Sequence, residues 1–483
     1  MKKLLFLIGI LSSGLYGASI DHIQTYSPDY LSDQAQTGMI DEVSPYYNPA
    51  GLSRLDKGKY VHLGLQLANG HEKMSYKGKE HKAHLTQLIP NVSLTSVDDN
   101  GAYFFTFGGL AGGGKLEYDG VSGIDVLSDL DQFKPLGVYD KGSTLTGKNL
   151  YEQATLGRAF TINDQLSVSV AGRIVHGSRN LSGTLNIGTN PTTAYKQAKA
   201  RQVAQEVSKA VDAATQGSGL SVTQIAAIKQ QKTTQALSLL QTKMNALQQN
   251  GLSGDLDSKR EAWGYGFQIG VNYKVNDKLN LAARYDSRIK MNFKAKGSEN
   301  QLQTADIIGS NIGLSTFYPQ YTINSKIRRD LPAILSVGAS YKVTDNYLVS
   351  TSANYYFNRH AKMDRVTTFG GHEHGRDYKN GWEIALGNEY KLNDKFTSIG
   401  SVNYARTGAK NSSFNDTEYA LNSVTLGAGL RYKYDDTLSI TGSVAHFIYE
   451  KEDGNFKEKY KVNDNQKYHK EITAFGLSVT KKF

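Results

Sequence analysis

The ten-residue stretch GYGFQIGVNY, residues 264–273, decides the fold class of this chain. In it, bulky side chains alternate with glycine, glutamine and asparagine, and the bulky ones are Tyr265, Phe267, Ile269, Val271 and Tyr273. A period of two places all the bulky residues on one face of a β-strand. In a soluble sandwich that face would point into the core, whereas in a membrane barrel it would face lipid and the small face would line the lumen.

The same alternation recurs in fourteen segments of the chain. They cover residues 59–69, 85–97, 101–111, 149–162, 165–177, 262–275, 278–290, 331–343, 347–359, 380–391, 396–407, 420–433, 437–449 and 471–483. Six short connections rich in Asp and Asn, residues that suit tight turns, alternate strictly with seven long loops. Short turns at one end and long loops at the other are typical of outer-membrane barrels. We therefore predict an all-β, 14-stranded antiparallel transmembrane β-barrel.

The composition agrees with a membrane barrel and argues against other classes. The 483 residues include 48 Gly and 30 Tyr but only 8 Pro, which suits a large antiparallel sheet with aromatic girdles. Beyond the first residues no stretch of ~18 apolar residues exists, so a transmembrane helix is excluded. The absence of cysteine excludes disulfides and thiolate chemistry. No catalytic triad order or phosphate-binding loop stands out, and we do not expect an enzyme.

Two segments precede the first strand. Residues 1–18 combine a basic start, an apolar run and small residues, which predicts a secretory signal peptide and an exported protein. Residues 19–57 are polar and rich in turns, and they contain Asn48, Pro49, Ala50 and Gly51. Proline fixes its own φ and forces the preceding Asn48 to be extended, so this is turn chemistry. We expect residues 19–57 to plug a barrel formed by residues 58–483.

One long loop carries a helical insert. Residues 194–249 are rich in Ala, Gln and Lys, and a break at 217–219 divides them into two helices. Ser221 and Gln224 have the spacing of a capping box for the second helix. We expect a surface helical hairpin in an extracellular loop, packed over the barrel mouth. The alternative is a gate or a partner-binding arm.

Several motifs resemble the FadL family of outer-membrane transporters for long-chain fatty acids and other hydrophobic molecules. They are Asn48-Pro49-Ala50, Trp263-Gly264-Tyr265-Gly266, Leu331-Pro332-Ala333 and Ile384-Ala385-Leu386-Gly387. The terminal Phe483 is similar to the signature by which barrel-assembly machinery selects its clients. The resemblance implies a monomeric barrel blocked by an N-terminal hatch, with substrate captured in an apolar groove among the outer loops and passed to a deeper apolar pocket.

The resemblance also implies an exit. In the family, the hatch rearranges and substrate leaves through an opening in the wall where the third strand is kinked. Here the end of that strand carries five glycines, which are Gly108, Gly109, Gly112, Gly113 and Gly114. Glycine within a strand marks a bend or a loss of pairing, so these residues are our candidates for a lateral opening. The alternative is a flexible junction between strand and loop.

A carboxylate ligand would need a cation near the pocket mouth. The candidates for binding its headgroup are Arg179, His374 and Arg376, and the alternative is that each is a solvated loop residue. The sequence His372-Glu373-His374 suggests metal ligands but lacks a fourth ligand. We therefore expect no metal site and no cofactor.

The formal charge of +10 sets expectations for partners. Basic residues crowd the predicted outer loops, for example Lys73, Lys77, Lys79, Lys82, Lys451, Lys457 and Lys459. Outer-membrane lipid and lipopolysaccharide phosphates are their natural counterparts, and nucleic acid is not expected. The leading hypothesis is a monomeric transporter of long-chain fatty acids. The alternatives are a channel for aromatic or alkane hydrocarbons, as in other members of the family, and an adhesin that binds a host ligand through its outer loops.

Overall fold

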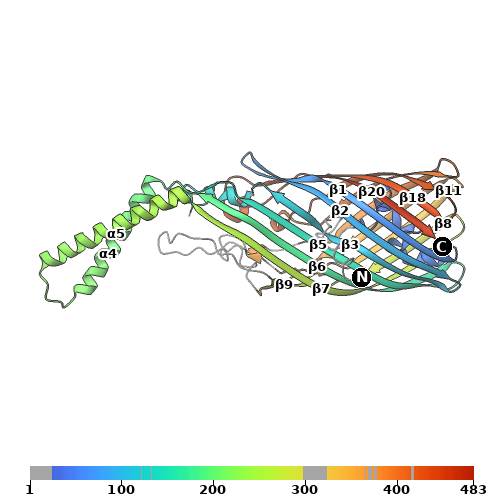
Figure 1. Ribbon diagram of the computed structural model, residues 1–483, viewed down its shortest axis with the longest axis horizontal. Coiled ribbons are helices and arrows are strands. Elements are labelled where there is room, and N and C mark those ends of the chain that lie inside the picture. The colour runs from blue at the N-terminus through green and yellow to red at the C-terminus, as the bar shows by residue number, and fades with distance from the viewer. Residues whose placement is uncertain are drawn as a thin grey trace.

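The computed structural model describes residues 24–120, 122–131, 133–296, 324–364, 366–367, 373–374, 378–414 and 418–483. Fourteen strands of this described chain close into one antiparallel barrel (Figure 1). They are β1 (Gly58–Tyr76), β2 (Lys79–Asp98), β3 (Gly101–Tyr118), β5 (Thr144–Thr161), β6 (Leu166–Gly188), β7 (Leu252–Lys274), β8 (Leu279–Asp286), β11 (Ile334–Thr344), β12 (Tyr347–Tyr356), β15 (Gly381–Lys391), β16 (Phe396–Arg406), β17 (Ser423–Lys433), β18 (Leu438–Tyr449) and β20 (Lys467–Lys482). The predicted signal peptide lies outside the described residues.

Each strand pairs with the next, and β20 returns to pair with β1, so the sheet has no free edge. The terminal residue takes part in this closure, because the Phe483 amide donates to the Lys59 carbonyl at 2.8 Å. All fourteen predicted segments coincide with a strand of the barrel. Closure matters in a bilayer, because lipid offers no hydrogen bonds to an open edge.

The exposure of the β7 side chains decides between a sandwich and a membrane barrel. Tyr265 is 69% exposed and Phe267 is 50% exposed, although both are large and apolar. Their small and polar neighbours on the strand face the lumen, where Asn272 is buried. The apolar face therefore points outward, as a lipid-facing wall requires. Among the described residues no helix is both long and apolar enough to span a bilayer.

The six predicted turns join strands at one end of the barrel, called here the turn end. In four of them a single side chain holds the turn, and Asn163 illustrates how. Its Oδ1 accepts hydrogen bonds from the amides of Gln165 and Leu166, at 2.9 and 2.8 Å. Asn276, Asn393 and Asp435 make the same pair of bonds in their own turns. The recurrence of Asp and Asn in the sequence thus has a direct structural cause.

At the other end, called the loop end, several strands continue far beyond the predicted segments. Strand β6 has 23 residues and ends at Gly188, whereas the sequence predicted an end at residue 177. At ~3.3 Å per residue this is about 75 Å, more than twice the ~30 Å of a bilayer core. The extensions carry polar outward residues, so the apolar alternation that revealed the membrane part stops before the strands do.

The loop end also carries short elements. They are the strands β4 (Tyr139–Asp140), β9 (Asn292–Lys296), β10 (Lys326–Arg328), β13 (Val366–Thr367), β14 (Glu373–His374) and β19 (Glu452–Asp453), and the helices α3 (Ser122–Asp125), η4 (Val126–Asp129), η5 (Lys134–Leu136), η7 (Asn358–His360), η9 (Asn411–Ser413) and α7 (Phe456–Tyr460). Most of these helices pack apolar side chains over the mouth of the barrel.

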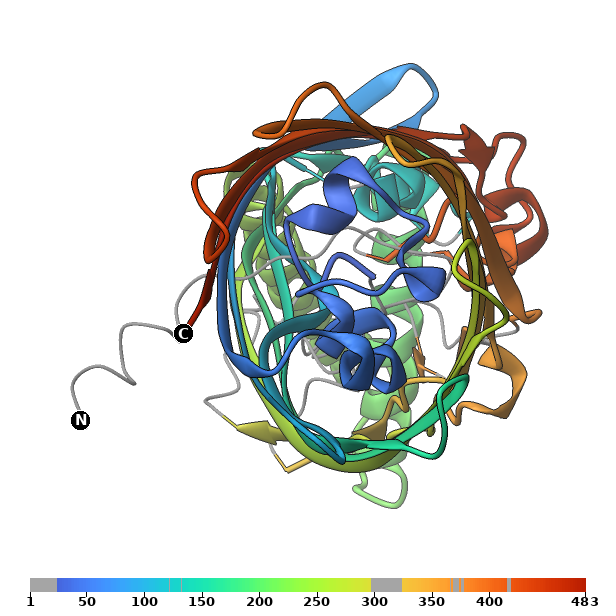
Figure 2. The same cartoon turned by 90° about the vertical axis from the view of Figure 1, so that its right-hand side faces the viewer.

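The N-terminal segment lies inside the ring of strands (Figure 2). It consists of short helices joined by turns, namely α1 (Asp29–Ser32), η2 (Gln36–Gly38), α2 (Ser44–Tyr47) and η3 (Pro49–Arg54). We call its described part, residues 24–57, the plug. Nearly all of its side chains from residue 24 to 52 are buried. A polar, turn-rich segment can be buried here because the barrel wall supplies its hydrogen-bond partners.

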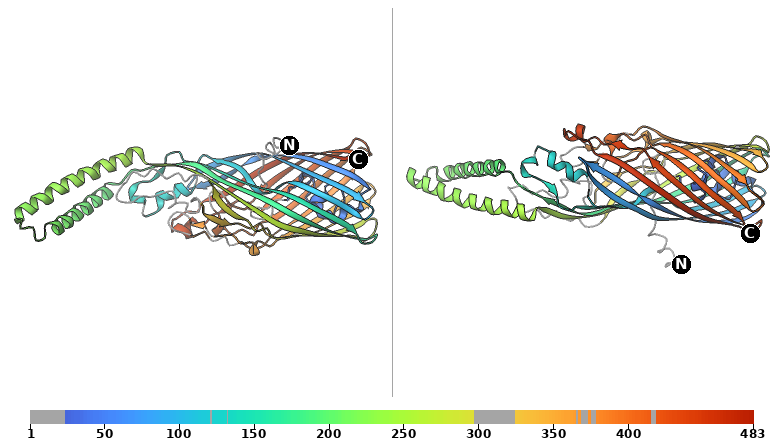
Figure 3. Two further views of the ribbon diagram at one scale, coloured as in Figure 1. Left: turned by 60° about the horizontal axis from the view of Figure 1, so that its bottom comes forward. Right: turned by 90° about the horizontal axis from the view of Figure 1, so that it is seen from above.

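The helical insert comprises α4 (Thr193–Thr215) and α5 (Val222–Asn250). The predicted capping box is confirmed, since Ser221 and Gln224 bond reciprocally across the first turn of α5. The expectation that the hairpin packs over the barrel mouth is wrong, because it projects away along the long axis of the barrel (Figures 1 and 3). Only Val211, Met244 and Leu247 of the two helices are buried, whereas Val222 and Leu239 are exposed.

Candidate functional site

The predicted Asn-Pro-Ala-Gly motif forms hydrogen bonds both within the plug and to the barrel wall. Asn48 caps η3 through its Oδ1, which accepts from the Gly51 amide at 3.2 Å. Its Nδ2 donates to the Met39 carbonyl at 2.9 Å and to Oδ1 of Asn272 on β7 at 2.8 Å. Pro49 begins the 3-10 helix, where a missing amide costs nothing. Asparagine at this position therefore both shapes the plug and fastens it.

The wall holds the plug mainly through small polar side chains. Ser443 and Ser401 donate to the plug carbonyls of Pro28 and Ser32, at 2.7 and 2.8 Å. The Ala50 carbonyl accepts from Ser167 on β6 at 2.7 Å. A net contribution of ~1 kcal/mol is typical for one such bond. The plug is thus held by many separable bonds and not by a continuous strand ladder.

Glycines on the lumen face let the plug approach the wall. A Cβ at Gly387 would lie 2.0 Å from the Asp33 carboxylate, and one at Gly64 would lie 2.4 Å from Pro28. The alternation in the sequence indicated small residues on the lumenal face. Plug atoms occupy the space beside them, so these residues do not line an open channel.

A buried ionic group supports one side of the plug. Arg284 on β8 donates to the Tyr46 carbonyl and pairs with Asp286, whose Oδ2 lies 3.1 Å from its Nε. Arg173 on β6 lies 3.6 Å from the same carboxylate, and Gln268 donates to it at 2.7 Å. A small polar pocket beside this group is lined by Tyr26, Pro45, Tyr46, Thr106, Gly108, Gly109, Gln153, Thr155, Arg173, Gln268 and Asp286. Its walls suit water better than an acyl chain.

On the loop side of the plug lies a buried apolar group, which we call the inner cluster. The plug contributes Tyr26, Tyr30, Val43, Tyr46 and Tyr47, and the wall contributes Leu110, Ala111, Tyr151, Val175, Ala262, Ile289, Met291, Phe293 and Leu331. Phe293 meets Tyr151 edge to face with ring centroids 5.8 Å apart. Five apolar or aromatic side chains of the plug thus meet the wall in one buried group.

The five predicted glycines lie where β3 leaves β2. The register pairs Asn91 with Gly108, but the next pair along is His84 with Glu117. Between these pairs β3 bulges twice against its other neighbour, and Gly112 and Gly114 adopt φ of 111° and 72°. Both values lie in the left-handed region that favours glycine.

The shift turns β3 into the lumen. Leu110 and Ala111 are both buried in the inner cluster, although neighbours in a regular strand would face opposite sides. The interrupted seam, residues 85–90 of β2 opposite residues 109–116 of β3, therefore lies directly beside the apolar contact of plug and wall.

The structure places one predicted headgroup residue at the inner cluster. The Arg179 guanidinium lies 5.9 Å from the Phe293 ring centre, and its Nε donates to Asn149 at 2.9 Å. Arg179 also forms an ion pair with Glu418, whose other oxygen lies 2.7 Å from Nη1 of Arg329. His374 lies in β14, and Arg376 is outside the described residues.

Sequence reasoning missed Arg329 and Glu418. Arg329 stands two residues before the Leu331-Pro332-Ala333 motif, so its position was readable, but nothing in the sequence indicated that it is buried. Glu418 lies in the long loop before β17, where an acidic residue is ordinarily solvated. Only the fold brings the three charges together.

A second apolar group, the outer cluster, covers the mouth. It includes Tyr76, Leu127, Phe414, Tyr419 and Tyr468 from different loops and strand ends. Tyr419 and Tyr468 lie with ring centroids 4.3 Å apart. The outer cluster also includes Leu31 of the plug, and its member Tyr419 directly follows Glu418 of the charged group in the chain.

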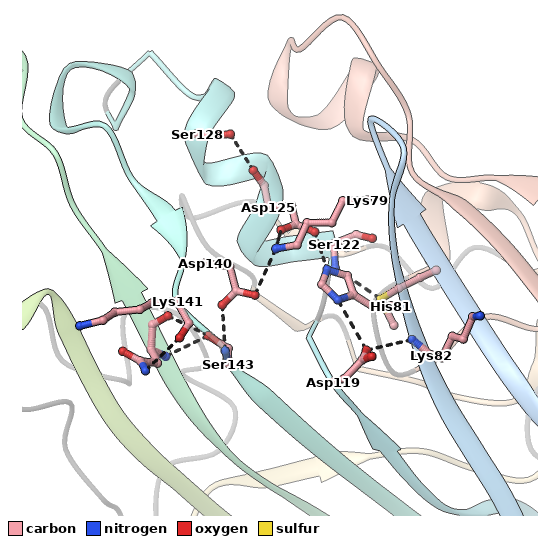
Figure 4. A network of polar contacts seen from close by, with 12 residues as sticks. Lys79, His81, Lys82, Asp119, Ser122, Asp125, Ser128, Asp140, Lys141 and Ser143 are labelled. Carbon is pink, nitrogen blue, oxygen red and sulfur yellow. Dashed lines mark hydrogen bonds and ion pairs between the residues drawn. The ribbon is translucent and has the colours of Figure 1, made fainter.

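A polar network fastens this cover to the β1–β2 hairpin (Figure 4). Asp125 accepts from His81 at 2.6 Å and from the Lys79 ammonium at 2.7 Å, and Asp140 lies 3.3 Å from the same ammonium. His81, Asp125 and Asp140 have ligand atoms close enough for one metal ion. The Lys79 ammonium bonds both carboxylates and so neutralises one of their two negative charges.

Several of the basic residues expected to meet anionic lipid are likewise paired within the protein. Lys77 lies 2.7 Å from Asp129, and Lys82 lies 3.1 Å from Glu80. The positive charge of this surface is therefore smaller than the count of lysines suggested.

The model of the family described as "Outer membrane protein transport protein (OMPP1/FadL/TodX)" matches residues 143–483. A 47 kDa outer membrane protein of Pasteurella multocida is 26% identical over 208 residues, which are 41% of this chain and 46% of that protein. Outer membrane protein P1 of Haemophilus influenzae is 24% identical over 221 residues, 44% of each chain. The chain spans about half the length of the curated relatives it matches.

Solved structures share the fold over most of the chain. A FadL homologue of Pseudomonas aeruginosa superposes with a TM-score of 0.65 at 15% identity, covering 97% of this chain and all of that one. The toluene transporter TodX of P. putida gives a TM-score of 0.57 at 16% identity, covering 90% and 92%. At such identities the likeness concerns the fold.

Proposed function

Because the chain belongs to the OMPP1/FadL/TodX family of outer membrane transport proteins, we propose that this outer-membrane barrel carries long-chain fatty acids or similar hydrophobic molecules across the membrane. The observation that carries the proposal is the position of the inner cluster. It touches the plug on one side and the interrupted β2–β3 seam on the other. A ligand that replaces the plug tyrosines there both loosens the plug and stands beside a gap in the wall.

The proposed route has three steps. An acyl chain first enters the outer cluster, then the inner cluster, and leaves sideways into the bilayer through the seam at Gly108, Gly109, Gly112, Gly113 and Gly114. Burying a chain of sixteen carbons gains on the order of 12 kcal/mol, at ~0.8 kcal/mol per CH₂. A protein that binds so favourably must weaken its own contact before release. Rearrangement of residues 19–57, acting as a hatch, does this, and the membrane receives the ligand.

Two other candidates have an observation in their favour. A channel for aromatic hydrocarbons is supported by the aromatic lining of the inner cluster and by the shared fold with the toluene transporter. An adhesin is supported by the α4–α5 hairpin, which projects beyond the other loops that the structure describes (Figure 1). Fatty-acid transport is preferred because two guanidinium groups lie at the inner cluster, where a carboxylate would arrive.

The test is uptake of labelled oleate, toluene and a sugar by cells with and without the protein. Transport of long-chain fatty acids predicts protein-dependent uptake of oleate and none of sugar. Uptake of toluene alone would identify the hydrocarbon channel. Binding to host cells without uptake of either hydrophobic ligand would support the adhesin and refute the transporter. We further expect a monomer in contact with outer-membrane lipid and lipopolysaccharide.

A further inference from the structure

Two arginines converge on one glutamate directly above the inner cluster. Arg179 comes from β6 and Arg329 precedes β11, and both reach the Glu418 carboxylate, each at a different oxygen. Arg329 is 1% exposed, and the side chains of Arg179 and Glu418 are 15% and 13% exposed. Together these three groups carry a formal charge of +1.

The position of this group is tied to the apolar site by backbone and ring contacts. The Arg329 amide donates to the Met291 carbonyl at 2.9 Å, and the Arg179 guanidinium faces Phe293. Met291 and Phe293 are both members of the inner cluster. A ligand whose chain lay among these residues would bring a terminal carboxylate to the place that Glu418 occupies.

We propose that Glu418 is a resident carboxylate that holds the headgroup subsite between Arg179 and Arg329, and that an anionic ligand binds by displacing it. This inference rests on the proposed transport of hydrophobic ligands and names what selects among them. Exchange of one carboxylate for another conserves the ion pairs, so it costs little. A neutral hydrocarbon cannot form ion pairs with the arginines, so it does not displace Glu418.

Displacement of Glu418 would also reach the outer cluster. The next residue, Tyr419, is buried there between Tyr468 and the ammonium of Lys470, which lies 4.2 Å from its ring centre. A shift of Glu418 must therefore strain or release these ring contacts. An anionic ligand would in this way loosen the cover over the mouth, whereas a neutral one would not.

The test compares oleate with oleyl alcohol, which has the same chain without the carboxylate. Both are titrated against the detergent-solubilised full-length barrel, as wild type and as Glu418→Gln. Removing the competing charge should raise the affinity for oleate at least fivefold and change that for oleyl alcohol less than twofold. Glu418→Asp, which keeps the charge, should behave like the wild type. Glu458→Gln, an equal change of charge on an exposed residue of α7, is the matched control.

The outcomes separate the two proposals. Unchanged or weaker oleate binding by a folded Glu418→Gln barrel, with wild-type binding of both ligands, overturns the resident carboxylate and leaves the transporter standing. Equal gains for oleate and oleyl alcohol also overturn it, because the effect is then not on the headgroup. Failure of wild type and variant to bind either ligand rejects the proposed function and this inference with it.

Discussion

The two edges of strand β2 differ along the same stretch of chain. Toward β1 the ladder is unbroken from Gly58 opposite Val97 to Tyr76 opposite Lys79. Toward β3 it stops after Asn91 and returns only at His84. Pro90 of β2, which has no amide to donate, lies within the interrupted stretch, and the bulged part of β3 lies opposite it. The glycines of β3 allow it to bulge and turn inward, whereas the side chains of β1 keep a regular pleat. The interruption of the ladder is thus explained by residues of both strands that face it.

The largest expected effect concerns the plug, because the proposed opening beside it can pass a ligand only if the plug moves. A Cβ at Gly270 on β7 would lie 3.6 Å from the Cβ of Ala50, within the range for a disulfide. The chain has no cysteine of its own, so Ala50→Cys with Gly270→Cys forms a single defined tether. Oxidation should reduce oleate uptake more than tenfold, and reduction should restore it.

Each single cysteine variant is the control for that tether. Uptake that persists through the oxidised tether would mean that the seam works with the plug at rest. The interrupted ladder between β2 and β3 would then be sufficient to explain transport, and no movement of the hatch would be needed.

A smaller effect is expected from restoring a side chain to the bulged strand. Gly112 has a φ of 111°, and a Cβ there would lie 2.5 Å from the Asn149 carbonyl oxygen. Gly112→Ala should cost ~1–3 kcal/mol of stability through backbone strain and shift the position of β3. We expect a lower unfolding temperature and a severalfold loss of uptake.

Gly172→Ala on β6 is the matched control, because nothing lies within 4 Å of its added Cβ. If Gly112→Ala behaved like Gly172→Ala in both measurements, the bulge of β3 would not depend on glycine. The glycines would then not explain why the β2–β3 ladder is interrupted and the β1–β2 ladder is not.

The smallest effect concerns the outer end of β2, where the cover is fastened. Burial alone would raise the pKa of Asp129, but hydrogen bonds from Lys77 and Tyr76 outweigh it and hold that pKa below its usual value. Burial would likewise raise the pKa of Asp140, but interactions with Ser143 and Lys79 outweigh this effect and lower that pKa.

Carboxylates with lowered pKa values stabilise the fold above their unfolded pKa of about 4 and lose that contribution as the pH falls through the folded value. Hydrogen exchange should therefore show weaker protection of residues 122–129 below about pH 4, while the β1–β2 ladder stays protected. Loss of protection already near pH 6 would contradict this assignment.

The sequence was enough to predict the barrel, because lipid imposes a rule on every strand. Tyr265 and its outward neighbours must be apolar, inward positions must admit the plug, and each turn needs a residue such as Asn163. The constraints on outward and inward positions apply to every strand, so the same alternation of residues recurs in all fourteen. The outer half of β6 has no lipid to face, so it carries no such pattern, and its length was not foreseen.

The candidate site was predictable only where backbone geometry demands a residue type. Asn48-Pro49 predicts a turn, and the run of glycines in β3 predicts a departure from a regular strand. Arg329 and Glu418 carry no comparable mark. Their importance comes from burial and from mutual contact across loops, and neither property is written in local sequence. The orientation of the α4–α5 hairpin was missed for the same reason, since it depends on where β6 and β7 end.

The most direct test of the account is to lock the seam itself. A Cβ at Gly109 would lie 3.3 Å from Cγ2 of Ile89, so cysteines at these two positions can join β2 to β3. Cysteines at Ala68 and Gln87, which face each other on the unbroken edge, provide the matched control. Oleate uptake should fall strongly on oxidation of the Ile89/Gly109 pair, recover on reduction, and stay unchanged in the Ala68/Gln87 pair. Undiminished uptake through a locked β2–β3 seam would contradict lateral release.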